Sequence, residues 1–314
     1  MRKLVRDLAL ALRECVVPNL GSHAHRAHGD ELAEGGDVTF KIDEEAEELL
    51  GSFLRERAPG VAYYSEDQGL VAPEGAETVL IVDPIDGTRP AMAGLESCCV
   101  SIAAAPLREG VTMGEVTIGC VVEIPSGTVF LAERGQGIVE GPEVKLSANE
   151  RIDRMFWTYG FRGRPARIAV EAIADLIDGS SVGGGTFELG SAAYDMTRVL
   201  TGQCDAYVEP GPRIIADVPE TRAEFERVGN GAILNNSPYD LAAAALLLEE
   251  AGAIVTDAYG EPLAGHELLG SGAEFQMSIV CSANRPLHDA IIEKIDGGIE
   301  RLRVGLRPEV REPS

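Results

Sequence analysis

The spacing of apolar and polar residues divides the chain into helix-like and strand-like segments. Residues 2–17 and Lys41 to Arg57 repeat apolar positions every three to four residues, which predicts two amphipathic helices. Short apolar runs follow at close intervals and predict a largely antiparallel sheet. The predicted strands are Val61–Ser65, Thr78–Asp83, Ser97–Ala105, Gly114–Ile124 and Thr128–Ala132.

The second half alternates strands and helices, which is typical of an α/β layer. The stretch 141–149 is a plausible boundary, so we expect an α+β half at 1–149 and an α/β half at 150–314. Residues 210–236 show little periodicity and predict a long functional loop. The predicted strands are Met155–Tyr159, Asp205–Glu209, Ile254–Thr256 and Met277–Cys281, and the predicted helices are Arg167–Ile177, Ser191–Leu200, Pro238–Ala251 and Pro286–Ile295.

Charge and hydropathy narrow the classes of partner. The 314 residues include 27 Lys and Arg against 51 Asp and Glu, a formal charge of −24. Such a surface repels nucleic acid and anionic lipid. No apolar run approaches the roughly 20 residues of a membrane helix, and the charged N-terminal helix is no signal peptide. We therefore expect a cytoplasmic protein. The six cysteines form no CxxC pair, so a disulfide framework is not expected.

The clearest chemical signal is the run Asp83-Pro84-Ile85-Asp86-Gly87-Thr88. A predicted apolar strand ends there on two carboxylates three positions apart, with a backbone carbonyl between them. Oxygen ligands of this kind suit a hard cation such as Mg²⁺. Asp-Pro and Asp-Gly are also common turn pairs. The position directly after a buried strand favours the metal site.

Five elements together resemble the inositol monophosphatase family of metal-dependent, lithium-sensitive phosphatases. They occur in the family's order over most of the chain, which makes the set more specific than any single motif. The elements are Asp37-Val38-Thr39 with Asp43, Ser65-Glu66-Asp67, the Asp83–Thr88 run with CCVSIA after it, Gly190–Asp195 with the run to Glu209, and Pro238–Ala243.

The resemblance implies a layered αβαβα sandwich of α+β and α/β parts, like those of inositol monophosphatase and fructose-1,6-bisphosphatase, and a homodimer. It implies hydrolysis of a small phosphorylated metabolite by metal-activated water, with two to three Mg²⁺ ions. Inositol monophosphate and fructose 1,6-bisphosphate are the leading substrates. A 3′-phosphoadenosine-type nucleotide phosphatase, a histidinol-phosphate phosphatase and a non-catalytic metal- or metabolite-binding protein of the same fold are the alternatives.

The resemblance also assigns roles to residues. Glu66, Asp83 and the Ile85 carbonyl would hold one metal ion, and Asp83, Asp86 and Asp240 a second, with a third, weaker ion near Glu66 and Asp43. The proposed catalytic residues are Asp43, Thr88 and Glu66, of which Thr88 and Asp43 orient and deprotonate the attacking water. The proposed substrate contacts are Gly87, Thr88, Ser191, Ala192 and Glu209.

Each assignment has a structural alternative. Asp240 follows Ser237-Pro238 at a predicted helix start, where capping favours an acid. Asp43 to Glu48 would otherwise be a solvated acidic helix face, Glu66 a surface acid and Glu209 a loop acid. His23, His25 and His28 invite a zinc or nickel site, but their spacing lacks a tetrahedral set and favours a solvated loop.

The chain departs from the family where the substrate pocket is expected. Glu209 and Asp240 stand much farther apart than in the family, so residues 210–236 form an insertion, which carries Arg213, Arg222 and Arg227. Arg89 follows the Asp-Gly-Thr element. Any of these arginines could bind a second phosphate or a carboxylate, or be surface charge. The resemblance therefore supports the type of reaction more strongly than it supports a particular substrate.

Overall fold

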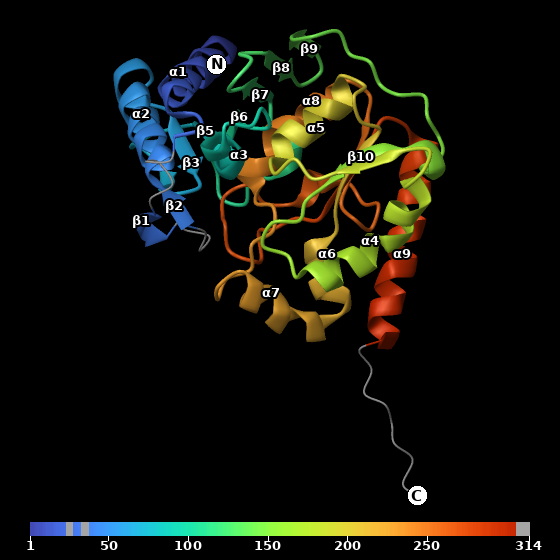
Figure 1. Ribbon diagram of the computed structural model, residues 1–314. Coiled ribbons are helices and arrows are strands. Elements are labelled where there is room, and N and C mark those ends of the chain that lie inside the picture. Colours follow the sequence, from blue (N-terminus) through green and yellow to red (C-terminus); the bar gives the residue numbers. More distant parts are fainter. Residues whose placement is uncertain (23–27, 33–37, 306–314) are drawn as a thin grey trace, which may run out of the picture.

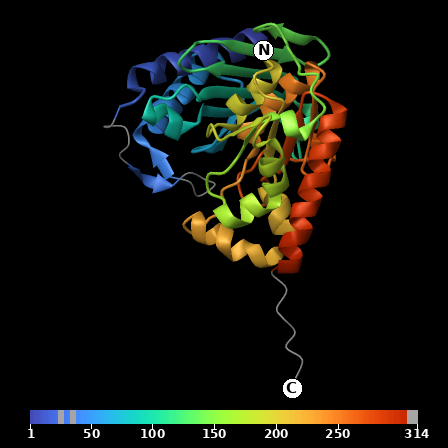
Figure 2. The same cartoon turned by 45° about the vertical axis from the view of Figure 1, so that its right-hand side comes forward.

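The chain folds into five layers, in the order helices, sheet, helices, sheet, helices (Figures 1 and 2). A computed structural model describes residues 1–22, 28–32 and 38–305, without the side chains of 28–32 and 38–39. Three apolar cores lie between the layers. This arrangement confirms the predicted αβαβα sandwich.

The first sheet has seven strands in the order β4-β3-β5-β6-β7-β8-β9. Neighbouring strands pair antiparallel, except that β3 and β5 are parallel. The sheet is thus largely antiparallel, as the close spacing of the strands predicted. Helices α1 (Arg2–Val16) and α2 (Lys41–Arg57) cover its outer face. A separate pair, β1 (His28–Leu32) and β2 (Val38–Phe40), precedes α2. The strands are β3 (Ala62–Ser65), β4 (Gly69–Val71), β5 (Thr78–Asp86), β6 (Cys99–Pro106), β7 (Ile118–Glu123), β8 (Val129–Glu133) and β9 (Gly137–Glu140).

Strand β5 is buried on both faces, which accounts for its continuous apolar run. Successive side chains of a strand point to opposite faces. Leu80 and Val82 therefore pack in the core with α1 and α2, whereas Val79 and Ile81 pack in the central core. The strand carries its final carboxylates out of this apolar environment to one end of the sheet.

The second sheet has the order β11-β10-β12-β14-β13. The central helices α5 (Ala192–Leu200) and α8 (Pro238–Glu250) contact both sheets, and α4 (Ala166–Ser180) and α9 (Arg285–Gly305) cover the outer face. Strand β10 is parallel to β11 and β12, and the other pairs are antiparallel. The strands are β10 (Phe156–Tyr159), β11 (Gly185–Phe187), β12 (Ala206–Glu209), β13 (Ile254–Thr256) and β14 (Ile279–Ser282).

The insertion differs from the prediction of a long loop. It contains α6 (Gly211–Asp217), a 3₁₀ turn at Pro219–Thr221 and α7 (Arg222–Val228). Phe225 and Ile214 anchor it in the outer core of the second sheet. Its helices are each seven residues long, too short to show a clear helical period in the sequence.

Most predicted elements are present with ends shifted by a few residues, and α9 extends ten residues past its predicted end at Ile295. Strands β4, β9 and β11 were not predicted, since three or four residues give too little pattern. Within the described ranges, we find no helix with the length and apolar character needed to span a bilayer.

Candidate metal centre and adjoining cavity

The end of β5 brings two carboxylates to the junction of the layers. The pairing of β5 with β6 shifts register between Asp83 and Asp86, so both acids lie at an irregular strand end. Asp83 and Asp86 are 3% and 6% exposed. The Ile85 amide donates a hydrogen bond of 3.0 Å to Asp83 Oδ1, which fixes that carboxylate against its own turn.

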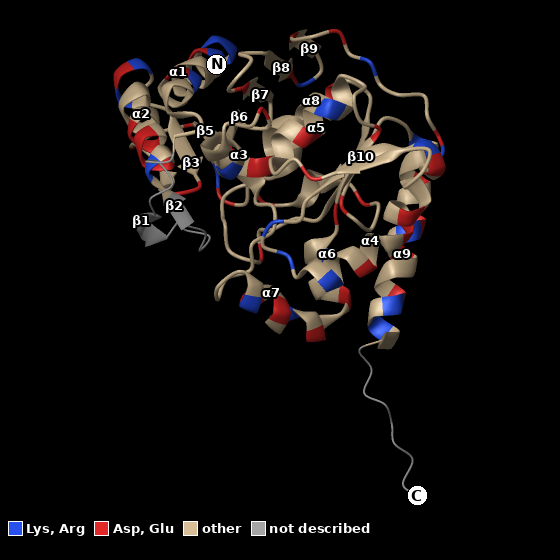
Figure 3. Cartoon of the chain, in the orientation of Figure 1, with Lys and Arg blue, Asp and Glu red and all other residues tan. Residues whose placement is uncertain are grey.

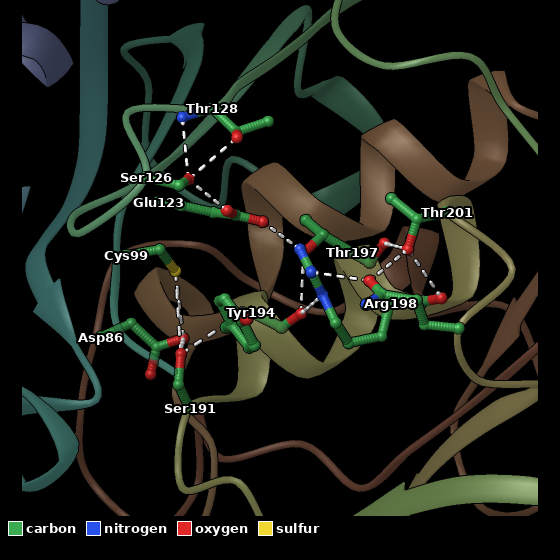
Figure 4. Close-up of polar contacts among 11 residues, drawn as sticks. Asp86, Cys99, Glu123, Ser126, Thr128, Ser191, Tyr194, Thr197, Arg198 and Thr201 are labelled. Atoms are coloured by element: carbon green, nitrogen blue, oxygen red, sulfur yellow. Dashed lines mark hydrogen bonds and ion pairs between the residues drawn. The ribbon is translucent and has the colours of Figure 1, made fainter. Parts of the chain in front are cut away.

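The start of α5 holds Asp86 from the other side (Figure 4). Ser191 Oγ donates a hydrogen bond of 2.7 Å to Asp86 Oδ2. The Ala193 amide donates one of 2.6 Å to the same oxygen. Ser191 is also the N-cap of α5, and its hydroxyl accepts from the Tyr194 amide. The Cys99 thiol lies 3.9 Å from the same carboxylate oxygen. Helix α5 therefore orients this acid with its first backbone amides.

The third acid comes from α8. Asp240 is the third residue of this helix, and its Oδ2 accepts a 2.6 Å hydrogen bond from the Ser237 amide in a capping box. The capping role predicted as the structural alternative is therefore real. One carboxylate oxygen from each of Asp83, Asp86 and Asp240 nevertheless lies within 4.8 Å of the others. Capping aims Asp240 toward the other two acids.

The cluster is electrostatically unfavourable when it is unneutralised. Burial raises the pKa of Asp83 well above its usual value, and the charges of Glu66, Asp86 and Asp240 raise it further. Burial also raises the pKa of Asp86, although the bonds from Ser191 and Ala193 oppose the shift. Burial and the Asp86 charge raise the pKa of Asp240 to about 7. A divalent cation would relieve this repulsion, and carboxylate oxygens are its preferred ligands. The donor set therefore fits Mg²⁺.

Glu66 and Ile85 line the same cavity as the three acids. Glu66 is not part of the close group of three within the described residues. Its charge is the largest electrostatic influence on Asp83 after burial, so it lies near that acid. The cavity holds about 480 Å³ of atom-free space, including its open mouth.

A hydroxyl–carboxylate pair forms another wall of this metal cavity. Thr88 Oγ1 lies 3.0 Å from Asp43 Oδ1 and 3.1 Å from the Ile85 carbonyl oxygen. The Phe40 amide donates to Asp43 Oδ2 at 2.9 Å and holds the carboxylate at the start of α2. A hydroxyl has one proton and two lone pairs, so Thr88 can donate to Asp43 and accept from a water molecule.

Gly87 lets the chain turn between β5 and α3 (Thr88–Ala93). Its φ is +90°, a conformation that glycine adopts without strain. A Cβ at this position would lie 2.6 Å from the Ser97 carbonyl oxygen and 2.9 Å from Ser191 Cβ. Only glycine fits here, and the turn places the first amides of α3 beside the acids.

A second cavity adjoins the metal cavity. It contains about 430 Å³ of atom-free space, including its mouth. Both cavities are lined by Asp86, Arg162, Gly190 and Asp240. The further lining residues are Tyr159, Gly160, Phe161, Arg164, Glu188, Ser191, Ala192, Asp195, Tyr207, Asn235 and Asn236.

The structure brings most of the predicted site residues to these two cavities. The metal cavity is lined by Asp43, Glu66, Asp83, Ile85, Asp86, Gly87, Thr88 and Asp240, and the second cavity by Ser191 and Ala192. Glu209 lines neither and is fully buried.

The predicted arginines divide into two groups. Arg89 lines the metal cavity and stacks over Phe40, 5.5 Å from the ring centre. The arginines of the insertion line neither cavity. Arg213 pairs with Asp217 and Asp296, Arg222 with Glu226, and Arg227 with Glu224. Figure 3 shows the basic and acidic positions next to each other along α7. The insertion therefore brings no arginine to the site.

Sequence reasoning missed Arg162, which lines both cavities. The segment Gly160–Pro165 holds two glycines and two arginines directly after a predicted strand, and that pattern was the available signal. His23, His25 and Asp37 lie outside the described residues, as does the side chain of His28.

The sequence is similar to those of known proteins. The sequence profile of the inositol monophosphatase family matches residues 2–300. The chain is 26% identical over 266 residues to an inositol-1-monophosphatase of Mesorhizobium japonicum, with 83% of each chain covered. It is 28% identical over 272 residues to a fructose-1,6-bisphosphatase/inositol-1-monophosphatase of Methanothermobacter thermautotrophicus, covering 83% of this chain and 84% of that protein.

The fold is also similar to that of solved structures. The crystal structure of the extragenic suppressor protein suhB from Bartonella henselae superposes with a TM-score of 0.72 at 21% identity. The match covers 94% of this chain and 98% of that one. At this identity the likeness shows the fold.

Proposed function

The chain belongs to the inositol monophosphatase family, and from this premise we propose that it is a Mg²⁺-dependent phosphatase that hydrolyses a small phosphomonoester. The observation that carries the proposal is a single cavity. It combines three clustered acids, Asp83, Asp86 and Asp240, with the Thr88–Asp43 pair. A metal-storing or purely structural acidic cluster has no need of a hydroxyl–carboxylate pair at its wall.

The metal ligands are the clustered acids. Asp83, Asp86 and Asp240 would hold the ions, with Glu66 and the Ile85 carbonyl as further ligands for a total of two to three Mg²⁺. Bound there, Mg²⁺ supplies positive charge for the phosphate oxygens and makes water more acidic. Ser191 and Ala193 keep Asp86 oriented when the ions are exchanged.

Thr88 and Asp43 act on the attacking water. Thr88 donates its proton to Asp43, and its free lone pair accepts a hydrogen bond from the water. The water proton then passes through Thr88 toward Asp43, which the Phe40 amide keeps in place. Glu66, on the same cavity wall, assists this step from the metal side.

The phosphate lies at the start of α3. The first amides of a helix have no acceptor within the helix, so those of Gly87 and Thr88 can donate to phosphate oxygens. Arg89 adds a positive charge to the same cavity. The remainder of the substrate enters the second cavity, past Ser191 and Ala192.

The substrate is a compact polyol or sugar phosphate, with inositol monophosphate and fructose 1,6-bisphosphate as first candidates. A 3′-phosphoadenosine nucleotide would need a surface on which the base stacks. Tyr159 and Phe161 line the second cavity and meet edge to face with ring centres 5.8 Å apart. Histidinol phosphate would need acids for its amine, which Glu188 could supply. Relative turnover separates these substrates.

The test separates metal binding from catalysis. In Thr88→Ala and Asp43→Asn, Mg²⁺ should still raise the melting temperature, while phosphate release falls by about 10²- to 10⁴-fold because the proton-transfer pair is lost. In Asp83→Asn both responses should disappear. Near-normal turnover in Thr88→Ala would contradict the assigned water-activating role.

The rival from a different class is a non-catalytic metal- or metabolite-binding protein of the same fold. It predicts Mg²⁺ binding with no phosphate release from any phosphomonoester, whereas our proposal requires both. The homodimer stays a prediction from the family resemblance, and sedimentation of the purified protein would test it.

A further inference from the structure

The second cavity is where the non-reacting part of the substrate would lie, since it shares Asp86, Gly190 and Asp240 with the metal cavity. The family resemblance placed Glu209 there as the acceptor for a substrate hydroxyl. In the structure, Glu209 Oε1 is bound by groups of the protein, whereas its Oε2 has no hydrogen-bond partner within the described residues.

Glu209 is used inside the protein. Its Oε1 accepts a 2.7 Å hydrogen bond from the Gly211 amide and one of 3.2 Å from Arg164 Nε. The side chains of Arg164 and Glu209 are 5% and 0% exposed. Gly160 packs against the stem of this side chain, because a Cβ on Gly160 would lie 2.7 Å from Glu209 Cγ. Gly160 lines the second cavity, whereas Glu209 lines neither cavity.

Arg164 fixes the loop between β10 and α4. Besides Glu209, its Nη2 donates to Asn236 Oδ1 at 3.1 Å, and its Nη1 donates to the backbone carbonyl of Arg162. Asn236 Nδ2 in turn donates to the Tyr207 hydroxyl at 3.0 Å. Each nitrogen of the Arg164 guanidinium therefore donates to a group of the protein, and one of them holds the backbone of Arg162.

The end of the insertion packs against the same loop. Gly163 has φ +76°, and a Cβ there would lie 2.7 Å from Leu234 Cβ. Leu234 therefore packs against the loop, and Asn236 binds it through Arg164. Arg213 and the arginines of α7 pair with acids elsewhere. The insertion acts on the site through this loop.

The loop places the Arg162 side chain at the boundary between the two cavities. It lines the metal cavity together with Asp83, and it lines the second cavity together with Glu188. Glu188 and Asp195 also line the second cavity. Of the four residues that line both cavities, Arg162 carries the positive charge.

We propose that Arg162 is a specificity-determining residue that binds a second anionic group, phosphate or carboxylate, of the phosphomonoester. This inference rests on the proposed function and narrows its substrate class. A guanidinium binds either group through two parallel hydrogen bonds. Of the two first candidates, fructose 1,6-bisphosphate would then be preferred to inositol monophosphate, and a phosphorylated carboxylic acid becomes a further candidate.

The test compares substrates that differ by one anionic group. The pairs are fructose 1,6-bisphosphate with fructose 1-phosphate, and 3-phosphoglycerate with glycerol 3-phosphate. The wild-type protein should favour the doubly anionic member of at least one pair by about ten- to a hundred-fold in kcat/KM, the value of a charged hydrogen-bonded contact. The pair that shows the preference identifies phosphate or carboxylate as the second group.

Arg162→Gln should bring that ratio close to one, and Arg162→Lys should restore part of it. The matched control is Arg227→Gln on α7, which pairs with Glu224 outside both cavities and should keep the wild-type ratio. Thermal melts establish that each variant is folded. An unchanged ratio in Arg162→Gln, or equal losses for both members of a pair, would overturn the proposal.

A failure of the phosphatase proposal is recognised separately. If the wild-type protein hydrolyses none of the four compounds, calorimetry with the same compounds and Mg²⁺ replaces kinetics. Tighter binding of the doubly anionic members that disappears in Arg162→Gln would support the anion site while the phosphatase proposal fails. Equal binding by both proteins would overturn the anion site.

Discussion

Glu47 offers a quantitative test of how the site is supported. This acid was predicted to belong to a solvated helix face, but it is 5% exposed. Its Oε2 accepts hydrogen bonds of 2.9 Å from both Ser65 Oγ and Gln68 Nε2. The side chain thus ties α2, which carries Asp43, to the turn that carries Glu66. Burial raises the pKa of Glu47 from 4.5 to about 7.

The sign and size of the effect follow from that pKa. A raised pKa means that the folded protein binds the proton more tightly than the unfolded chain, so the free energy of unfolding falls as the pH rises from about 4.5 to about 7. At about 1.36 kcal/mol per pKa unit, a shift of about 2.5 units costs about 3 kcal/mol above pH 7. Glu47→Gln is neutral throughout and avoids this cost.

The variant also loses part of a hydrogen-bond network, because the new amide group faces the donors of Ser65 and Gln68. We expect this to cost about 1 kcal/mol at every pH. Glu47→Gln should therefore be about 1 kcal/mol less stable than the wild type at pH 4 and about 2 kcal/mol more stable at pH 8. The stability difference between the variant and the wild type should thus change by about 3 kcal/mol between the two pH values, and this change is the diagnostic quantity.

Urea unfolding of both proteins at several pH values measures this difference. Other titrating groups are common to both proteins and cancel. Glu48→Gln is the control, because Glu48 lies one residue further along the same helix and is exposed. It shows how the removal of an exposed acid from this helix changes stability at each pH. If the stability difference between Glu47→Gln and the wild type does not change with pH, the argument that burial raises the pKa of Glu47 is wrong.

Three further predictions concern the site and its supports. Asp240→Asn keeps a capping oxygen but removes a charge. Because the pKa of Asp240 is raised to about 7, the metal-free wild-type protein loses stability as the pH rises from about 4 to about 7. In EDTA at pH 8 the variant should therefore be about 2 kcal/mol more stable than the wild type, after allowance for solvent screening, and Mg²⁺ should no longer raise its melting temperature. A less stable metal-free variant would contradict the electrostatic account. Arg198→Met leaves Glu123 buried without its partner (Figure 4) and should cost about 3–5 kcal/mol in urea unfolding, whereas a loss below 1 kcal/mol would show that the pair is solvated. Gly87→Ala places a Cβ 2.6 Å from the Ser97 carbonyl oxygen at a residue with φ +90°. The variant should lose about 1–3 kcal/mol in the free energy of unfolding and should no longer release phosphate. An active variant of wild-type stability would disprove the argument that this turn requires glycine.

The sequence was most informative where local pattern and chemistry coincide. The run Asp83–Thr88 follows a buried strand, and the structure places both of its acids at the strand end. Asp240 could be expected at a helix start from Ser237 and Pro238, and the capping geometry is present. The family resemblance supplied what local pattern could not, namely that these segments meet in space.

Tertiary packing decided the features that the sequence left open. The burial of Glu47 depends on β3 lying against α2, which no periodicity within α2 reveals. The pairing of Glu209 with Arg164 depends on the parallel arrangement of β10 and β12. The arginines of the insertion pair with acids that the folded chain brings close, and Arg162 reaches the cavities through a loop that showed no motif.

Phosphate release with and without Mg²⁺ tests the central claim most directly. The panel holds inositol 1-phosphate, fructose 1,6-bisphosphate, 3′-phosphoadenosine 5′-phosphate and histidinol phosphate, with the wild-type protein and Asp83→Asn. We expect turnover of at least one compound that requires Mg²⁺ and is absent in Asp83→Asn. No turnover of any compound by a wild-type protein with Mg²⁺ demonstrably bound, or equal turnover by Asp83→Asn, would contradict the account.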